Sequence, residues 1–307
     1  MRRSRHSRVN ARFINRQDRY SIARSLIGVL AITLLWLLSH QRSGSHFLKE
    51  TLCLQEENLE NFAGRHLALP EVFTEGSAAK YPAFKDWCFE PFHDERLREN
   101  PLKWGDPQGL ADAVSLFMDM IHEKAGGRIV LADIKLNQLY IGEGWFHQTT
   151  APPRMFYGLA DKSKLIFLRR RNLVRALVSG LLATKTGVWH TKHEDTDTSD
   201  PVKITIDIDN FMSQLTHLDR GLAEADCWLN AYPDTVHRVF YEDLFDANTL
   251  ACNAATFDAI ATFAGIGKAI EWRPSQKKIG MNRLEDIIEN FDELQIKLLP
   301  TKYSSML

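Results

Sequence analysis

Three consecutive arginines follow an apolar run in residues 164–179, and they are the clearest candidates for binding an anion. The stretch KLIFLRRRNLVRALVS is predicted to begin as a buried strand, Lys164–Leu168, and to continue as a helix, Leu173–Ala183. Ligand sites of α/β sheets lie beyond the carboxyl ends of the strands. Three guanidinium groups at such an end repel one another unless an anion lies there. Arg171 and Ser179 are eight residues apart, close to two helical turns, so both side chains are placed to reach one phosphate beside the helix.

A second candidate anion site is the loop that follows the apolar run Thr33–Ser39. A polar loop with one glycine and then an amphipathic stretch come next, an order typical of strand, loop and helix. Free N–H groups at a helix start suit phosphate, Arg42 adds a fixed cation, and Gly44 permits close approach of the backbone. Ser43 and Ser45 are the hydroxyl donors. A plain strand–helix turn is the alternative, and the absence of GxxxxGK[ST] disfavours an ordinary kinase or ATPase.

These loops require a sheet whose strands end at the same edge. Apolar runs alternate with stretches of helical spacing, which predicts one domain with a parallel α/β sheet. Residues 53–105 contain several prolines and are predicted to form short helices and loops. The predicted strands are 33–39, 128–134, 164–168 and 236–241, and the predicted helices are 109–124, 173–183, 209–231, one from 257, and 284–298.

The N-terminal part of the chain differs in charge from the rest. Residues 1–25 hold eight Arg and one acid, a net charge of +7, so the other 282 residues carry −8. This basic arm is predicted to be disordered, although transit peptides and the flanks of membrane anchors share its composition. The run Leu26–Leu38 has 13 residues without a charge, fewer than the roughly 20 that span a bilayer. We therefore expect it to fold into a single domain over 26–307, with a signal anchor as the alternative.

Composition excludes several classes of protein. Hydrophobic residues make up 44% and charged residues 25%, as in an ordinary globular protein. The formal net charge of −1 gives no electrostatic reason to expect a nucleic-acid partner. The four cysteines are scattered and have no histidine at ligand spacing, so neither a zinc site nor a disulfide framework is expected.

The two loops together resemble the 5′-phosphosulfate and 3′-phosphate loops of the P-loop sulfotransferases. The segments that carry the resemblance are QRSGSHFL and IFLRRRNLVRALVS, with Arg171, Asn172 and Ser179 in the family's spacing. Leu173, in place of Pro, is similar to the carbohydrate and nodulation-type branch. HRVFYEDLFDA and QKKIGMNRLEDIIENFDELQIKL resemble the late strand and the C-terminal loop and helix of that branch. The resemblance runs from about 33 to 298 and implies an α/β fold: a three-layer α/β/α, P-loop NTPase-like architecture with a central parallel sheet.

The resemblance also implies the substrates. The donor would be 3′-phosphoadenosine 5′-phosphosulfate (PAPS). The acceptor would be a hydroxyl or amine group, which we expect to belong to a carbohydrate. No metal would be needed. His46 stands where many members have Thr or Ser, so its side-chain donor differs. The donor-binding residues so implied are Arg42, Ser43, Gly44, Ser45, His46, Phe47, Arg171, Ser179, Lys277 and Lys278.

Three residues are the candidates for catalysis. Arg42 takes the position of the family's loop cation beside the bridging oxygen. LPEVF resembles the segment that carries the general base, with Pro70 in place of Gly, which points to Glu71, although Glu75 is close by. Lys135 follows the second predicted strand, where the family often has Lys or His near the transferred group.

Other interpretations stay open at this point. A membrane-anchored, non-catalytic binding protein would use residues 22–40 as a span, and a third class of protein would use the basic arm to contact anionic lipid or nucleic acid. Residues 184–203 are predicted to be a mobile acceptor loop rather than a metal site around His190 and His193. The compartment stays open between a soluble domain or organelle lumen and a Golgi type II membrane protein, and membrane association through residues 1–40 is compatible with the latter.

Overall fold

The computed structural model describes most of the chain from Leu34 onward. The described residues are 34–54, 66–71, 107–125, 129–140, 163–187, 202–246, 251–266, 271–274 and 283–307, with Pro153, Phe156, Leu159, Thr249 and Ala269. Residues 32–307 group into one compact unit.

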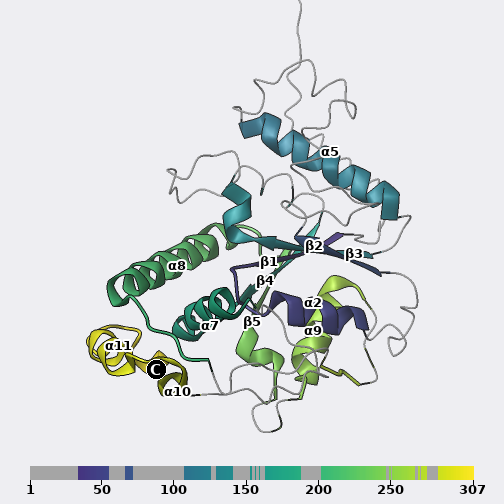
Figure 1. Ribbon diagram of the computed structural model, residues 1–307. Coiled ribbons are helices and arrows are strands. Elements are labelled where there is room, and N and C mark those ends of the chain that lie inside the picture. Colours follow the sequence, from purple (N-terminus) through teal and green to yellow (C-terminus); the bar gives the residue numbers. More distant parts are fainter. Residues whose placement is uncertain are drawn as a thin grey trace, which may run out of the picture. The chain divides into compact units, whose positions relative to one another are not determined.

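Five parallel strands form the sheet (Figure 1). Their order is β2-β3-β1-β4-β5, so β1 is the central strand. Each neighbouring pair is parallel, with Leu38 opposite Ile134 on one side and Phe167 on the other. The strands are β1 Leu34–Ser39, β2 His66–Glu71, β3 Ile129–Lys135, β4 Lys164–Arg169 and β5 Val236–Phe240.

Helices follow the strands in the alternation that the sequence predicts. The long helices agree with expectation within a few residues, but the predicted helix 284–298 is broken. The backbone of 287–289 pairs with Ile204 instead, since Ile204 N–H donates to the Ile287 carbonyl at 2.8 Å and Glu289 N–H donates to that of Ile204 at 2.9 Å. The α-helices are α2 Ser45–Leu54, α5 Pro107–Ala125, α7 Leu173–Thr186, α8 Ile208–Leu229, α9 Ala254–Ala264, α10 Leu284–Ile287 and α11 Phe291–Leu298, and the 3₁₀ turns are η3 Leu136–Tyr140, η4 Tyr241–Leu244 and η5 Ser304–Met306.

The sheet buries both of its faces, which explains why its central strands are continuously apolar. Trp36 and Leu38 of β1 point into one cluster with α5, α7 and α8, while Leu35 and Leu37 point into a second cluster with α2 and α9. Figure 1 shows α2 and α9 together on one side of the sheet and α5 on the other. The predicted three-layer α/β/α fold with a central parallel sheet is therefore confirmed.

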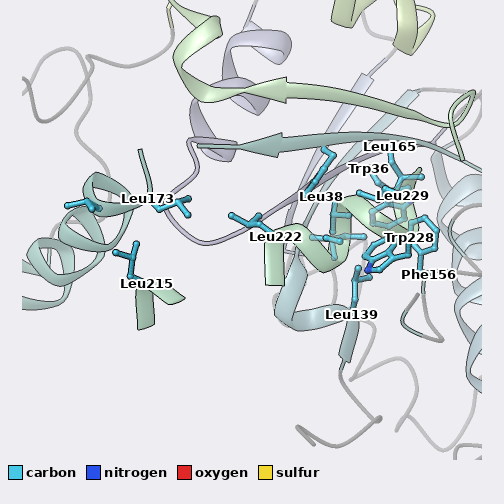
Figure 2. Packing of buried hydrophobic residues seen from close by; sticks show 14 of the residues in the cluster. Trp36, Leu38, Leu139, Phe156, Leu165, Leu173, Leu215, Leu222, Trp228 and Leu229 are labelled. Atoms are coloured by element: carbon cyan, nitrogen blue, oxygen red, sulfur yellow. The ribbon is translucent and has the colours of Figure 1, made fainter. Parts of the chain in front are cut away.

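The first cluster is closed by aromatic side chains (Figure 2). Phe156 packs edge to face on Trp228 of α8, with ring centroids 4.5 Å apart, beside Trp36 and Leu165 of the sheet. Edge-to-face pairs of this kind add roughly 0.5–1.5 kcal/mol beyond the area that they bury. This packing fixes β1 and β4, the two strands that carry the candidate site.

The apolar run near the N-terminus contributes a strand to the sheet, as expected, rather than forming a membrane anchor along its whole length. Its described part, Leu34–Ser39, is the middle strand of the sheet, with partners on both sides. Residues 26–33 lie outside the described residues. None of the helices in the described part of the chain is long and apolar enough to cross a membrane.

Candidate anion-binding site

The site lies where the sheet's connections diverge. After β1 the chain passes to β2 and β3 on one side, and β4 and β5 lie on the other side. The carboxyl ends of β1 and β4 therefore adjoin at a topological switch point, the usual position of ligand sites in open α/β sheets. The loop 40–44 follows β1, and residues 170–172 follow β4.

The loop after β1 has an unusual backbone conformation that its sequence supports at Gly44. Gly44 has φ +89°, and a Cβ there would lie 2.2 Å from Cδ2 of Tyr241, so no larger residue fits. Arg42 has φ +61°, a left-handed conformation that costs a non-glycine residue on the order of 1 kcal/mol or more. The Leu48 N–H donates to the Gly44 carbonyl at 3.1 Å, which joins the loop to the first turn of α2.

Lys135 lies beneath this loop and binds both ends of it. Its Nζ donates to Ser39 Oγ at 3.2 Å and to Ser45 Oγ at 2.6 Å. It also contacts both carboxylate oxygens of Asp133, at 3.0 and 2.8 Å. The side chains of the pair are only 7% and 5% exposed. A buried ion pair persists when further hydrogen bonds satisfy it, and here the two serine hydroxyls do so.

Arg42 joins the loop after β1 to helix α7. Its Nε and Nη2 atoms both donate to Ser179 Oγ, at 3.1 and 3.0 Å. Arg170 contributes from the end of β4, since its Nη1 donates to the Arg42 carbonyl at 3.4 Å and its guanidinium lies 4.8 Å from the ring centroid of Tyr241. The structure thus brings together residues from both loops that the sequence singles out.

The three consecutive arginines point to different partners, which relieves their mutual repulsion. Arg169 pairs with Asp226 of α8. Arg170 turns inward to the loop after β1. Arg171 is half-exposed and makes two hydrogen bonds with the carboxylate of Asp243, at 2.6 and 2.7 Å. Arg171 and Ser179, which the sequence places at one phosphate, therefore have separate partners in this structure.

Acids of η4 also cap the start of α7. The carboxylate of Glu242 accepts from the N–H groups of Arg171, at 3.0 and 3.1 Å, and of Asn172, at 3.3 Å. Asn172 caps the helix by accepting from Arg175 N–H at 2.8 Å, and its amide donates to the Met306 carbonyl at 2.7 Å. The N–H groups of Arg171, Asn172 and Arg175 at this helix terminus therefore all have protein acceptors.

Three buried polar atoms at the site have no hydrogen-bond partner within the described part of the chain. They are Ser43 Oγ, Nε of Arg170 and Nε2 of His40. Ser43 is completely buried and His40 is 5% exposed. Orphaned polar groups are rare in folded proteins and call for a ligand, an ion or water.

Burial shifts the pKa values of the groups around these atoms. Burial and two nearby cations, Arg170 and Lys135, lower the pKa of His40 to about 4, although its hydrogen bond to the Gln41 carbonyl opposes the shift. Burial also lowers the pKa of Arg42, and the charge of Arg170 adds to the effect. The phenol of Tyr241 has a raised pKa because it too is buried.

The beginning of α2 carries the two remaining predicted ligands of the first loop. His46 pairs with Glu50 at 2.9 Å and is partly exposed, and burial lowers its pKa. Phe47 is buried, stacked on Phe245 with centroids 4.7 Å apart, and it meets Phe257 edge to face at 6.5 Å. In this structure the Phe47 ring therefore belongs to the core on the α2 face.

The other predicted residues are placed only in part. Glu71 is the last residue of β2 and pairs in register with Asp133, so its backbone lies at the same edge of the sheet as Lys135. Lys277 and Lys278 lie outside the described residues, as do Glu75, His190 and His193. Among the described residues, no group of three or more His, Cys, Asp or Glu side chains could hold a metal ion.

Sequence reasoning missed three residues of the site, His40, Asp133 and Tyr241. It assigned a ligand to Arg171 rather than to Arg170, although it singled out all three arginines of the run. The pairing of Asp133 with Lys135 could have been predicted, because residues two apart on a strand share a face and Lys135 is two positions away. The contacts of Arg170 and Tyr241 depend on segments more than 100 residues apart, which local patterns do not reveal.

Comparisons with known proteins add a structural likeness. No protein-family model and no curated protein matches the chain. Among solved structures, the chain is similar to the crystal structure of a sulfotransferase from Alicyclobacillus acidocaldarius, with a TM-score of 0.42 and 11% identity. The alignment covers 89% of this chain and 91% of that chain.

Proposed function

We propose that this protein is a sulfotransferase that moves a sulfuryl group from PAPS to a hydroxyl or amine of an acceptor. The observation that carries the proposal is the meeting of two loops at the switch point: Arg42 from the loop after β1 is bonded to Ser179 of α7, beside the buried Lys135. The order and spacing of these residues are those that resemble the family's two phosphate loops.

The residues present fit an anionic donor. Ser43 Oγ and Nε of Arg170 are buried donors without a hydrogen-bond partner among the described residues, although Arg170 Nε lies 4.0 Å from the Glu242 carboxylate. Arg42 adds a half-buried cation. Buried donors and cations of this kind stabilise negative charge far more strongly than they would in water. An anionic oxygen bound here would satisfy the orphaned donors.

Fixed positive charge is what sulfuryl transfer requires. PAPS supplies the sulfuryl group, and charge develops on the bridging and equatorial oxygens as the bond to the phosphate breaks. Arg42 and Lys135 would stabilise that charge without the reorganisation that a flexible site requires. Glu71, whose backbone lies at the same edge, would take the proton of the acceptor.

The 3′-phosphate would be bound by Arg171 and Ser179, as the resemblance implies. Because Arg171 is paired with Asp243, the phosphate would have to displace that carboxylate. Lys277 and Lys278 would close over the nucleotide. The carbohydrate acceptor is proposed from Leu173 after Asn172, which is similar to the carbohydrate and nodulation-type branch. Membrane association in a lumenal enzyme of that branch would use the part of residues 1–40 that precedes the sheet strand Leu34–Ser39.

The proposal is tested by transfer of radioactive sulfate. The full chain is incubated with PAPS carrying sulfur-35 and a panel of glycans with free hydroxyl and amino groups, and labelled glycan is separated and counted. We expect labelled product from wild type and from Lys185→Met, an exposed lysine at the end of α7. Lys135→Met should give about 100- to 1,000-fold less labelled product. A folded wild-type protein that neither labels any glycan nor releases sulfate from PAPS would overturn the proposal.

A further inference from the structure

His40 is the one side chain among the three orphaned groups at the site whose ordinary pKa lies near neutral pH. It follows β1 directly, it is only 5% exposed, and it is not among the residues that the resemblance assigns to the donor. Its Nδ1 lies 2.6 Å from the Gln41 carbonyl oxygen. A carbonyl oxygen can only accept, so Nδ1 carries the proton in the neutral ring and Nε2 is a bare acceptor.

The charged groups that act on this unprotonated nitrogen are cations, which disfavour its protonation. The groups that act on His40 from neighbouring elements are Arg170 at the end of β4 and Lys135 at the end of β3, both cationic. Lys135 is partly neutralised by Asp133, and Arg170 is more weakly balanced by Glu242, whose carboxylate lies 4.0 Å from the Arg170 Nε. Two cations beside a buried imidazole keep it neutral.

An anion reverses this balance. We propose that His40 is a further binding residue for the anionic end of the donor: Nε2 takes up a proton from solvent when the anion binds, and the N–H so formed donates to an anion oxygen. No other bond changes, and the proton returns to solvent on release. The inference rests on the proposed function for the identity of the anion, but not for the proton uptake itself.

As a consequence, binding of the anion is coupled to the uptake of a proton by His40. The free site holds no proton on Nε2 near neutral pH, since burial and the two cations depress the pKa of His40. The bound site holds up to one, because a nearby negative charge stabilises imidazolium. Affinity should therefore rise as pH falls below 7, by up to about tenfold per pH unit for one proton taken up.

Calorimetric titration in buffers of different ionisation enthalpy measures the proton directly. Adenosine 3′,5′-bisphosphate and inorganic pyrophosphate are titrated at pH 6 into wild type, His40→Asn and His237→Gln. His40→Asn retains a donor for the Gln41 carbonyl, and His237 is a matched histidine on β5, stacked on Phe263. The ligands' own phosphates titrate equally in all three proteins, so the difference between proteins isolates His40.

We expect wild type and His237→Gln to take up more protons per ligand bound than His40→Asn does, and the variant to lose the pH dependence of affinity. Equal proton uptake in wild type and His40→Asn would overturn the inference. If the nucleotide fails to bind but pyrophosphate binds with His40-dependent uptake, the proposed function fails and this inference stands. If neither anion binds, both fail.

A second measurement needs no variant to fold. Histidine-selective nitrogen-15 NMR of wild type should show a neutral ring protonated at Nδ1 in the free protein, which becomes imidazolium when pyrophosphate is added at pH 6. A ring that keeps its bare Nε2 at saturating pyrophosphate would contradict the proposal.

Discussion

The two halves of the candidate site differ in how deeply their ion pairs are buried. The inner cluster consists of Ser39, Arg42, Ser45, Asp133, Lys135 and Ser179, and its central ion pair is 7% and 5% exposed. The outer cluster consists of Arg171, Glu242 and Asp243, and its ion pair is 50% and 45% exposed. Buried pairs are costly to disrupt, whereas exposed ones contribute about 0–1 kcal/mol.

This difference indicates which half is fixed before the ligand arrives. In the inner cluster Lys135 of β3 bonds to Ser39 of β1 and Ser45 of α2, and Arg42 bonds to Ser179 of α7. These contacts join elements that the core already holds, so the geometry is set by folding. In the outer cluster carboxylates occupy the guanidinium and N–H groups that would bind a phosphate, so binding there is an exchange. We expect the inner cluster to determine rate and stability, and the outer cluster to adjust affinity.

The largest effect is expected from removing the cation of the inner cluster. Lys135→Met should slow sulfuryl transfer by about 100- to 1,000-fold, the cost of one preorganised donor. It should also lower the free energy of unfolding by about 3–5 kcal/mol, because the Asp133 carboxylate is left buried and unpaired. Turnover with labelled PAPS and urea unfolding measure the two effects.

A double variant separates the stability of this pair from its role in transfer. Asp133→Leu combined with Lys135→Met should regain most of the lost stability, since no buried charge remains, but it should not regain activity. Full sulfuryl transfer by either folded variant would contradict the role given to Lys135.

Two glycines with positive φ, Gly44 beside the inner cluster and Gly187 at the end of α7, test whether the Tyr241 contact constrains the loop. Gly44→Ala combines a left-handed residue with a Cβ that overlaps the Tyr241 ring, so we expect a loss of roughly 2–4 kcal/mol in unfolding free energy. Gly187→Ala, at φ +70° with nothing within 4 Å of the new Cβ, should lose only about 1 kcal/mol. Equal losses in thermal unfolding would show that the Tyr241 contact does not constrain the loop.

The pH dependence of stability reports the burial of His40. Its pKa is about 4 in the folded protein and about 6.5 in the unfolded chain. Above pH 6.5 both states are neutral, so no stability is lost; between pH 6.5 and 4 the unfolded chain binds the proton first and the folded state is progressively destabilised. The loss approaches about 3 kcal/mol. Urea unfolding at pH 7 and 4.5 should show a smaller loss for His40→Asn, and parallel curves would refute the assignment.

The smallest effects are expected in the outer cluster. Arg171→Ala should change unfolding free energy by less than about 1 kcal/mol, because the pair is exposed, and should weaken binding of adenosine 3′,5′-bisphosphate by about tenfold. Asp243→Asn should tighten it, since the competing carboxylate is neutralised. The two dissociation constants from calorimetry decide this, and weaker binding by Asp243→Asn would exclude an exchange at Arg171.

Most of the fold was predictable from the sequence, since β1, β3 and β4 are largely apolar runs bounded by polar segments, and β5 is rich in β-branched and aromatic residues. β2 was missed because HLALPE is short, contains Pro70 and lies at the sheet's edge. The break at 288–290 was missed because it depends on a pairing with Ile204, more than 80 residues away.

The site was predictable as two loops but not as a set of contacts. Arg42 and Ser179 stand out by residue type and spacing, yet their hydrogen bond requires β1 and β4 to be neighbours. Tyr241 and Asp243, which follow β5, decide which of the three consecutive arginines turns inward. Local sequence identifies the charges, and the tertiary fold decides how they are paired.

The central claim is that the inner cluster binds the donor nucleotide, and calorimetric titration with adenosine 3′,5′-bisphosphate tests it most directly. Wild type should bind one molecule with a micromolar dissociation constant, about −8 kcal/mol. Arg42→Ala should weaken binding by about 30-fold or more, the scale of a lost buried charge-assisted contact, and more than Arg171→Ala does. A folded wild-type protein that shows no binding, or an Arg42→Ala variant that binds as tightly, would contradict the account.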